Sequence, residues 1–336
     1  MARGIRMADI AKQLGVSTVA VSKALGNQRG VSEELREKIK KTAEDMGYEL
    51  PAAYRNKDKK VYNIGILVSS IYIEKYVTFY WEFYQLLLKE AAKADCFLML
   101  EVLELEDEKE LRDAVLVQEE RIDGLIVLGR VSKEYLKHLK KACHIPVIYM
   151  DFYDVEMEED CIISNSFYGI YKITNYLFSQ GHEKIAFVGT LGMTDNINDR
   201  YLGYQKAMME HGKEVRTDWC IKDREDARRT YTQIEIPDEL PTAVVCNCDV
   251  TAGWLIKSLN ERGIRVPQDV SVVGYDDYLF PGICDVELTT YSVDRERMAM
   301  IGIDKMRKKI EGEPYQEGIH VVEGKLIERA SVLRCH

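Results

Sequence analysis

IRMADIAKQLGVSTVAVSKALG, residues 5–26, contains two short apolar-periodic segments on either side of a Gly-Val-Ser. The apolar residues of the first segment follow the spacing of one helix face: Met7, Ile10, Ala11 and Leu14. Gly15 is suited to end that helix, and Ser17 is suited to cap the next one. Two helices joined by such a turn form a helix-turn-helix, although the same spacing also occurs in a plain helical hairpin within a larger domain.

A third helix is expected to begin at Ser32, because Glu33 and Glu34 then lie at the positive end of its dipole. Its buried face is expected to contain Leu35, Ile39 and Met46. Residues 1–48 are therefore predicted to form a three-helix head. Residues 49–60 are polar, basic and weakly patterned, which is typical of a linker.

The charge of the chain is unevenly distributed. Residues 1–60 contain 13 Lys and Arg against 8 Asp and Glu, a net charge of +5. The whole chain has a net charge of -10, so the remaining residues contribute -15. A small basic head on an acidic body is typical of a DNA-binding module, because cationic side chains release counterions from the phosphates that they contact.

After residue 60, short apolar runs alternate with amphipathic helical segments. The candidate strands are residues 63–69, 96–102, 124–129, 146–150, 184–189, 242–247 and 270–275. The candidate helices are residues 80–94, 108–120, 133–142, 168–180, 200–212, 250–262 and 294–311. Val- and Ile-rich strands separated by helices indicate an α/β fold with doubly wound parallel sheets that are covered on both faces. Ligands of such folds bind beyond the carboxyl ends of the strands.

Length and composition exclude several classes of protein. A chain of 336 residues is long enough for two or three domains. No apolar run approaches the roughly 18 residues of a membrane span. The first residues are charged and lack a continuous apolar core, so we expect a cytoplasmic protein without a secretory signal. Eight cysteines without a CxxC pair are expected to be reduced thiols, and we expect neither a metal nor a cofactor.

Two stretches of the head, MADIAKQLGVSTVAVSKAL (7–25) and VSEELREKIKKTAEDMGY (31–48), resemble the headpiece of the lactose-repressor (LacI/GalR) family of transcription regulators. The body resembles the effector domain of that family, which shares its two-lobed fold with periplasmic sugar-binding proteins. The supporting stretches are GHEKIAFVG (181–189), DRYLGYQKAM (199–208), CDVTAGWLI (248–256), VPQDVSVVGYDD (266–277) and LTTYSVDRERMAMIGID (288–304).

The resemblance implies a homodimeric transcriptional regulator, and a repressor in particular, without enzymatic activity. Its expected partners are a pseudo-palindromic operator DNA and a small-molecule effector, a carbohydrate, bound between two lobes. The expected divisions are a DNA-binding headpiece (1–48), a hinge linker (49–60), an N-terminal lobe (61–163 and 292–317) and a C-terminal lobe (164–291 and 318–336).

The second helix of the head is implied to enter the major groove of the operator. Thr18, Val19 and Lys23 match the base-reading positions of the family. Ser17 and Ser22 match the positions that face phosphates. The further expected DNA contacts are Arg6, Asn27 and Arg55.

The hinge linker departs from the family. Many members carry a hinge helix whose leucine wedges into the minor groove, whereas Lys57 stands at the matching position here. We therefore expect little wedging by a leucine. The basic residues of the linker are expected to contact phosphates instead: Arg55, Lys57, Lys59 and Lys60.

Three positions matched to the effector pocket carry charges suited to sugar hydroxyls: Asp151, Arg200 and Asp276. The alternatives are loop-capping roles for Asp151 and Asp276, and a surface ion pair for Arg200. Tyr80 and Trp81 are candidates for stacking on a sugar ring, with core packing or subunit contact as the alternative. Asn247, beside Cys248, is a further candidate for ligand contact.

Two other classes of protein share parts of this pattern. A solute-binding protein for transport shares the two-lobed body, but the basic three-helix head argues against it. A nucleotide-dependent enzyme shares the doubly wound sheets. The sequence contains neither a GxxxxGK[ST] phosphate loop nor a GxGxxG that opens a helix, which argues against that class.

Overall fold

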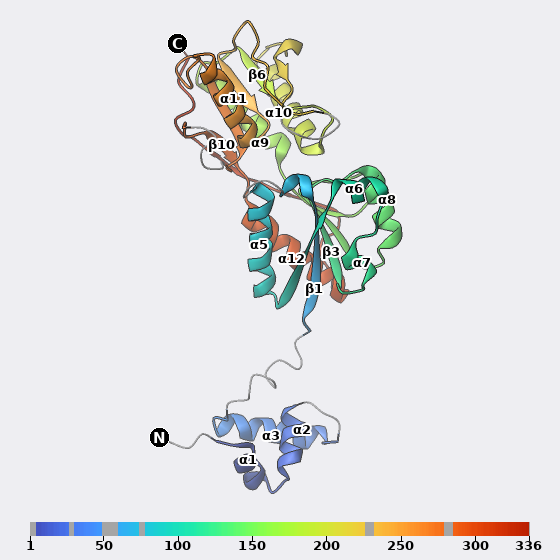
Figure 1. The fold of residues 1–336 in the computed structure, drawn as a ribbon. Helices are drawn as coiled ribbons and strands as arrows, with labels where there is room; N and C mark the ends of the chain where they lie inside the picture. Colours follow the sequence, from blue (N-terminus) through green and yellow to red (C-terminus); the bar gives the residue numbers. More distant parts are fainter. Residues whose placement is uncertain are drawn as a thin grey trace. The chain divides into compact units, whose positions relative to one another are not determined.

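The computed structural model describes residues 5–26, 30–48, 60–73, 78–225, 232–278 and 285–335. The chain forms two compact units, Met1–Val61 and Tyr62–His336, and each is described by itself (Figure 1). Among the described residues, no helix combines the length and the apolar character needed to cross a membrane.

The first unit contains the three predicted helices, α1 (Met7–Leu14), α2 (Thr18–Leu25) and α3 (Glu33–Asp45). Gly15 ends α1 with φ of 64°, a left-handed conformation that glycine adopts without strain. The Ser17 hydroxyl accepts a hydrogen bond from the backbone of Ala20 at 3.1 Å and caps α2. Ser32 caps α3 in the same way through Leu35. The predicted helix-turn-helix is therefore confirmed in its helices and in its caps.

The three helices enclose a small apolar core: Ile10, Ala11, Val21, Ala24, Leu25, Ile39 and Ala43. Leu35 and Met46, predicted to be buried, pack at its margin. Arg36 was not predicted to matter, yet it is buried within the head. Its guanidinium donates hydrogen bonds to the carbonyl oxygens of Lys23 at 3.3 Å and Ala24 at 3.2 Å. Arg36 thus ties α3 to the carboxyl end of α2, where a positive charge is favourable.

The N-terminal lobe of the second unit is built on a parallel sheet. Its strand order is β11-β5-β4-β3-β1-β2. The bounds are β1 (Tyr62–Ser69), β2 (Cys96–Leu103), β3 (Gly124–Leu128), β4 (Val147–Met150), β5 (Asp160–Ser164) and β11 (Ile319–Val322). One face is covered by α5 (Phe79–Lys93) and α12 (Arg295–Glu311), and the other by α6 (Leu105–Glu110), α7 (Val115–Gln118) and α8 (Lys133–Ala142) (Figure 1). A short helical turn, η1 (Ser70–Tyr72), follows β1.

The C-terminal lobe contains a second sheet, ordered β12-β10-β9-β8-β6-β7, which is parallel except for the antiparallel β10–β12 pair. Its strands are β6 (Ile185–Val188), β7 (Cys220–Ile221), β8 (Ala243–Cys246), β9 (Ser271–Asp276), β10 (Thr289–Ser292) and β12 (Lys325–Ile327). Its helices are α9 (Ser166–Ser179), α10 (Asp195–Glu210), η2 (Thr217–Trp219) and α11 (Asp249–Glu261). The predicted class, doubly wound parallel sheets covered on both faces, is confirmed in both lobes.

Three predicted boundaries were wrong. The helix expected at 108–120 is two helices, because Leu111 adopts a left-handed conformation that ends α6. The helix expected at 200–212 begins earlier, since Thr194 caps α10 by accepting a hydrogen bond from Ile197. Residues 318–336 do not all belong to the C-terminal lobe, because β11 pairs with β5 in the sheet of the N-terminal lobe.

The chain crosses between the two sheets three times. The crossings lie between β5 and α9, between β10 and α12, and between β11 and β12. Each lobe is therefore assembled from segments that are distant in the sequence, and the carboxyl edges of the two sheets supply the loops between the lobes.

We expect replacement of Arg36 by Met to lower the free energy of unfolding of the head by about 1.5–3 kcal/mol, because two hydrogen bonds from a charged donor are lost within the core. Hydrogen exchange of the α1–α3 backbone amides in the full chain measures this effect. The matched control is Lys40→Met, which removes an exposed ion pair with Glu37 and should change exchange little. Equal protection in the two variants would contradict the role given to Arg36.

Candidate effector cluster and DNA-recognition helix

The first turn of α2 carries the residues predicted to reach DNA. Thr18 is exposed, and Val19 is 60% exposed although it is apolar. Ser22 and Lys23 lie one turn later and are half-buried. An exposed helix start with a valine and a lysine can contact thymine methyl groups and guanine acceptor atoms in a major groove.

The other predicted DNA contacts have different outcomes. Arg6 is exposed, and its backbone amide donates to the Asp9 carboxylate at 2.8 Å, so it lies at the N-cap of α1. Lys60 is exposed and lies two residues before β1, at the end of the first unit. Four residues lie outside the described part of the chain: Asn27, Arg55, Lys57 and Lys59.

In the C-terminal lobe, Arg200 lies in the second turn of α10 and is buried. Its guanidinium donates to the Asn247 carbonyl oxygen at 2.7 Å, to Ser166 Oγ at 3.3 Å and to Asp276 Oδ1 at 3.2 Å. It also stacks over the Tyr275 ring at 3.9 Å. The surface ion pair considered for Arg200 is therefore wrong, because its partner Asp276 and the guanidinium are both largely enclosed.

In the N-terminal lobe, Asp151 directly follows β4 and is only 4% exposed. One carboxylate oxygen accepts a hydrogen bond from the Tyr80 hydroxyl at 2.7 Å. The other, Oδ1, is buried without a hydrogen-bond partner among the described residues. A buried acceptor that is left unsatisfied is costly, and it is expected where a ligand donates the missing bond.

The backbone at these carboxylates is strained. Asp151 has φ of 66°, Asp276 of 107° and Asp277 of 52°, all in the left-handed region that side chains other than glycine rarely adopt. Such strain occurs mainly at functional sites, where the surrounding structure holds it. The loop-capping alternative does not account for Asp151, because its side chain points to Tyr80 and its carboxylate caps no helix among the described elements.

The structure thus brings together five of the six predicted effector residues, which we call the effector cluster: Tyr80, Asp151, Arg200, Asn247 and Asp276. Trp81, the sixth, is not part of it. Trp81 is 36% exposed and contacts Tyr84 on α5, because adjacent residues of a helix point about 100° apart.

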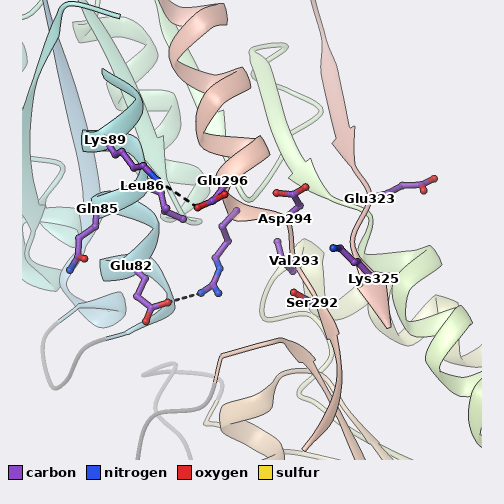
Figure 2. A pocket seen from close by; sticks show the side chains of 11 residues that line it. Glu82, Gln85, Leu86, Lys89, Ser292, Val293, Asp294, Glu296, Glu323 and Lys325 are labelled. Carbon is purple, nitrogen blue, oxygen red and sulfur yellow. Dashed lines mark hydrogen bonds and ion pairs between the residues drawn. The ribbon is translucent and has the colours of Figure 1, made fainter. Parts of the chain in front are cut away.

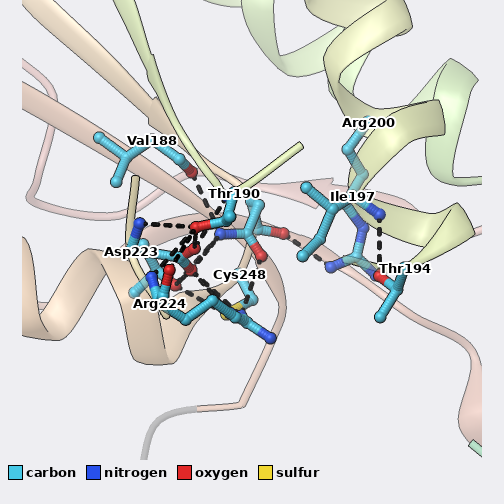
Figure 3. A network of polar contacts seen from close by, with 10 residues as sticks. Val188, Thr190, Thr194, Ile197, Arg200, Asp223, Arg224 and Cys248 are labelled. Carbon is cyan, nitrogen blue, oxygen red and sulfur yellow. Dashed lines mark hydrogen bonds and ion pairs between the residues drawn. The ribbon is translucent and has the colours of Figure 1, made fainter. Parts of the chain in front are cut away.

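A polar network that the sequence did not predict supports the cluster from behind (Figure 3). Asp223 Oδ2 accepts hydrogen bonds from Asn247 at 2.8 Å and Thr251 at 2.7 Å, and Oδ1 accepts one from Thr190 at 2.9 Å. Burial alone would raise the pKa of Asp223, but the charge of Arg224 and these hydrogen bonds leave that pKa lowered. The Asn247 side chain is thus held by Asp223, while the backbone carbonyl oxygen of Asn247 accepts from Arg200.

Arg224 follows Asp223 at the carboxyl end of β7 and extends toward the same edge. It pairs with Asp223 Oδ2 at 3.1 Å, and its Nη2 lies 3.4 Å from Asn247 Oδ1 and 4.0 Å from Cys248 Sγ. Charged residues at strand ends are common, so nothing in the sequence distinguishes Arg224 from the others. Arg224 becomes a candidate only because β6, β7 and β8 are neighbours in the sheet.

Burial raises the pKa of Asp276 to about 6; the charge of Arg200 opposes this rise and that of Asp151 adds to it. Burial likewise raises the pKa of Asp151, against Arg200 and the Tyr80 hydrogen bond. Hydrogen-bond donors from a ligand would favour the ionised carboxylates and lower both pKa values.

A cavity lies beside the crossings between the lobes, away from the effector cluster, and we call it the crossover cavity (Figure 2). It has a volume of about 730 Å³ and is lined by α5, the β10–α12 connection and the start of β12. Two of its cations are already paired, Arg295 with Glu82 at 2.9 Å and Lys89 with Glu296 at 3.8 Å. Four carboxylates and three cations line this cavity, so its charges nearly cancel. The unsatisfied buried acceptor, Asp151 Oδ1, belongs to the effector cluster and does not line this cavity.

Comparison with known proteins identifies both units. Residues 6–50 match the family described as "Bacterial regulatory proteins, lacI family", and residues 174–332 match a periplasmic binding protein-like domain. The HTH-type transcriptional repressor PurR of Pectobacterium carotovorum subsp. carotovorum is 30% identical over 337 residues, which covers 96% of each chain. The chain belongs to the lacI family of bacterial regulatory proteins.

Solved structures of this lacI-family fold extend over nearly the whole chain. The lac repressor dimer bound to operator and the anti-inducer ONPF superposes with a TM-score of 0.66 at 20% identity, covering 98% of this chain and 100% of that one. The complex of the transcriptional regulator CelR with cellobiose gives a TM-score of 0.67 at 21% identity, covering 97% and 99%. This lacI-family member is thus a DNA-binding transcriptional regulator with an effector-binding domain.

The raised pKa of Asp276 implies that the free energy of unfolding depends on pH. Its folded-state pKa, about 6, exceeds the usual value of 3.8, so the folded protein binds the extra proton between these pH values and loses that stabilisation as the pH rises through 6. Relative to Asp276→Asn, the wild type should therefore lose about 1–3 kcal/mol of unfolding free energy between pH 4.5 and pH 7. Urea unfolding at several pH values measures this.

The matched control for this pH series is Asp269→Asn. Asp269 is exposed, and its hydrogen bonds with Arg265 lower its pKa to about 2, so it stays ionised throughout the range. The difference between wild type and this control should be independent of pH above 4.5. A similarly flat difference for Asp276→Asn would show that Asp276 is ionised at an ordinary pKa.

Proposed function

We propose that this regulator is a homodimeric repressor whose effector is a carbohydrate bound at the effector cluster. The observation that carries the proposal is the buried Asp151 Oδ1, which lacks a partner among the described residues and lies in one cluster with the Arg200–Asp276 pair. Sugar hydroxyls both donate and accept. A carboxylate, a guanidinium and a second carboxylate in one cluster can therefore bind several of them.

The surroundings of the cluster support a small polar ligand rather than a large apolar one. The ring of Tyr80 packs at a tilt against that of Tyr72, with centroids 4.4 Å apart, which gives the site an aromatic wall. Sugar-binding sites combine such a wall with a few fixed polar groups. CelR, a protein of the same fold, has been solved in complex with cellobiose, which supports a carbohydrate as the class of effector.

The effector is proposed to act on the arrangement of the two lobes. Asp151 belongs to the N-terminal lobe and Arg200 to the C-terminal lobe, so a ligand that contacts both favours arrangements in which they are close. An effector regulates only to the extent that it binds one arrangement better than another. The repressor role rests on the relatives, which are transcriptional repressors.

The dimer is supported by apolar side chains that are exposed on one side of the N-terminal lobe. Trp81 and Leu88 are exposed on α5, and Val102 is exposed at the end of the edge strand β2, on the face of the sheet that α5 covers. Exposed apolar surface on a folded protein can mark a subunit contact. We therefore assign to Trp81 the subunit-contact role that was the alternative to ligand stacking.

DNA reading is proposed for Thr18, Val19 and Lys23, with phosphate contacts from Ser17, Ser22 and Arg6. The dimer would present two copies of α2 to the two halves of a pseudo-palindromic operator. A lysine is a single mobile charge rather than a planar fork, so its contact with guanine is less selective than that of an arginine.

A thermal-shift screen of the full chain against mono- and disaccharides, sugar phosphates and nucleosides tests the effector class. A ligand at 100 times its dissociation constant should stabilise the protein by about 2.7 kcal/mol, and Arg200→Ala and Asp151→Asn should abolish its shift. Asp269→Asn, on the outer surface, should retain it. A shift produced by a nucleoside alone would reject the carbohydrate and leave the cluster as the site.

Binding to a selected operator tests the recognition helix. Lys23→Ala should reduce the discrimination between that operator and one with a substituted guanine by about 1–3 kcal/mol, because one base contact is lost. Lys40→Ala, an exposed lysine on α3, removes the same charge from the head and should leave the discrimination unchanged. Equal effects of the two variants would indicate that Lys23 acts only through the phosphate backbone.

A further inference from the structure

Arg130 connects the two lobes at a place separate from the Arg200–Asp276 pair. It lies two residues beyond β3, and its side chain is 18% exposed. Within its own lobe it donates to the Tyr153 carbonyl oxygen at 2.8 Å and to Asp154 Oδ2 at 2.9 Å. It also pairs with the carboxylate of Asp195, the first residue of α10 in the other lobe.

Two further hydrogen bonds join the same loops. The Tyr153 hydroxyl donates to Asp199 Oδ1 at 3.0 Å, and Asn196 Nδ2 donates to the Asp151 carbonyl oxygen at 2.8 Å. The start of α10 is thus attached to the segment after β4 by three side chains. These contacts can exist only while the two lobes are close together.

Arg130 is also connected to the effector cluster through its backbone. The Tyr72 hydroxyl donates to the Arg130 carbonyl oxygen at 2.9 Å, the Tyr72 ring packs at a tilt against the Tyr80 ring, and the Tyr80 hydroxyl donates to Asp151. Gly129 allows this arrangement, because a Cβ atom there would lie 2.9 Å from the Tyr72 ring. Asp151 and Arg130 are therefore linked on both sides, through the tyrosines and through the start of α10.

We propose that Arg130 is a positioning residue that holds the lobes together over the effector site without contacting the effector. Its two carboxylate partners make this reversible. When the lobes separate, the bond to Asp195 is lost, while Asp154 still pairs with the guanidinium. Arg130 therefore keeps a charged partner when the lobes open. The pair with Asp195 favours the closed arrangement without preventing opening.

This arrangement assigns different roles to the two acids. Asp195 contributes only to the closed arrangement, whereas Asp154 contributes to both. Removing Asp195 or Arg130 should favour the open arrangement, and removing Asp154 should not. Replacing either Arg130 or Asp195 removes the same ion pair. The double substitution should therefore favour opening no more than either single substitution does.

Hydrogen–deuterium exchange of the full chain, without any ligand, tests the proposal. Arg130→Gln and Asp195→Asn should each increase exchange of backbone amides at residues 195–200 and 151–157 by at least threefold, and the double variant should exceed neither. Asp154→Asn is the matched control, and its exchange at residues 195–200 should equal that of the wild type. Amides of β8, in the C-terminal core, should be unaffected in all four variants and so report that the fold is intact.

Either of two outcomes would overturn the proposal. One is additive effects of Arg130→Gln and Asp195→Asn, or no effect at all. The other is an effect of Asp154→Asn at residues 195–200 as large as that of Asp195→Asn. That result would mean that the contacts of Arg130 stabilise the N-terminal lobe in general and do not act on closure. Because no effector is used, this result is independent of the carbohydrate proposal, and either can fail without the other.

Discussion

The burial of one guanidinium, that of Arg200, organises the C-terminal lobe around the effector cluster. A charge removed from water is tolerated only when its donors are satisfied and an opposite charge is near. Here the donors reach Asn247, Ser166 and Asp276, and the ring of Tyr275 covers one face. These partners come from the end of β8, the start of α9 and the end of β9, so a single side chain fixes how three elements meet.

The buried polar groups around Arg200 need hydrogen-bond partners of their own. Asn247 accepts from Arg200 with its backbone carbonyl oxygen and donates to Asp223 with its side-chain amide, and Asp223 is in turn held by Thr190, Thr251 and Arg224. Each of these residues follows or lies near the carboxyl end of a strand. The parallel sheet gathers polar groups that are up to about a hundred residues apart in sequence at one edge, which the isolated segments could not do.

Much of this arrangement could be predicted from the sequence, for identifiable reasons. The head follows from local signals: a glycine turn and two serine caps. Asp151 and Asp276 follow apolar strands, and parallel strands bring such ends together. Arg200 could be placed only through family resemblance, because it lies inside a helix that begins at a threonine cap.

Trp81 was misplaced, since a run of aromatic residues does not indicate which helix face meets the site. Arg36, Arg130 and Arg224 went unnoticed because nothing local distinguishes a buried or bridging arginine from a solvated one. β11 was assigned to the wrong lobe because pairing between distant segments leaves no signal in a four-residue strand.

The three crossings between the sheets affect the order in which the parts of the protein can fold during synthesis. The head needs only residues 5–48, so it can fold as soon as they have been synthesised. The N-terminal lobe needs α12 and β11, and the C-terminal lobe needs β12, so neither lobe is complete before residues 319–327 are available. The element that binds DNA thus matures first, and the element that controls it matures last. During synthesis, all residues of the head are therefore available before either lobe can be completed.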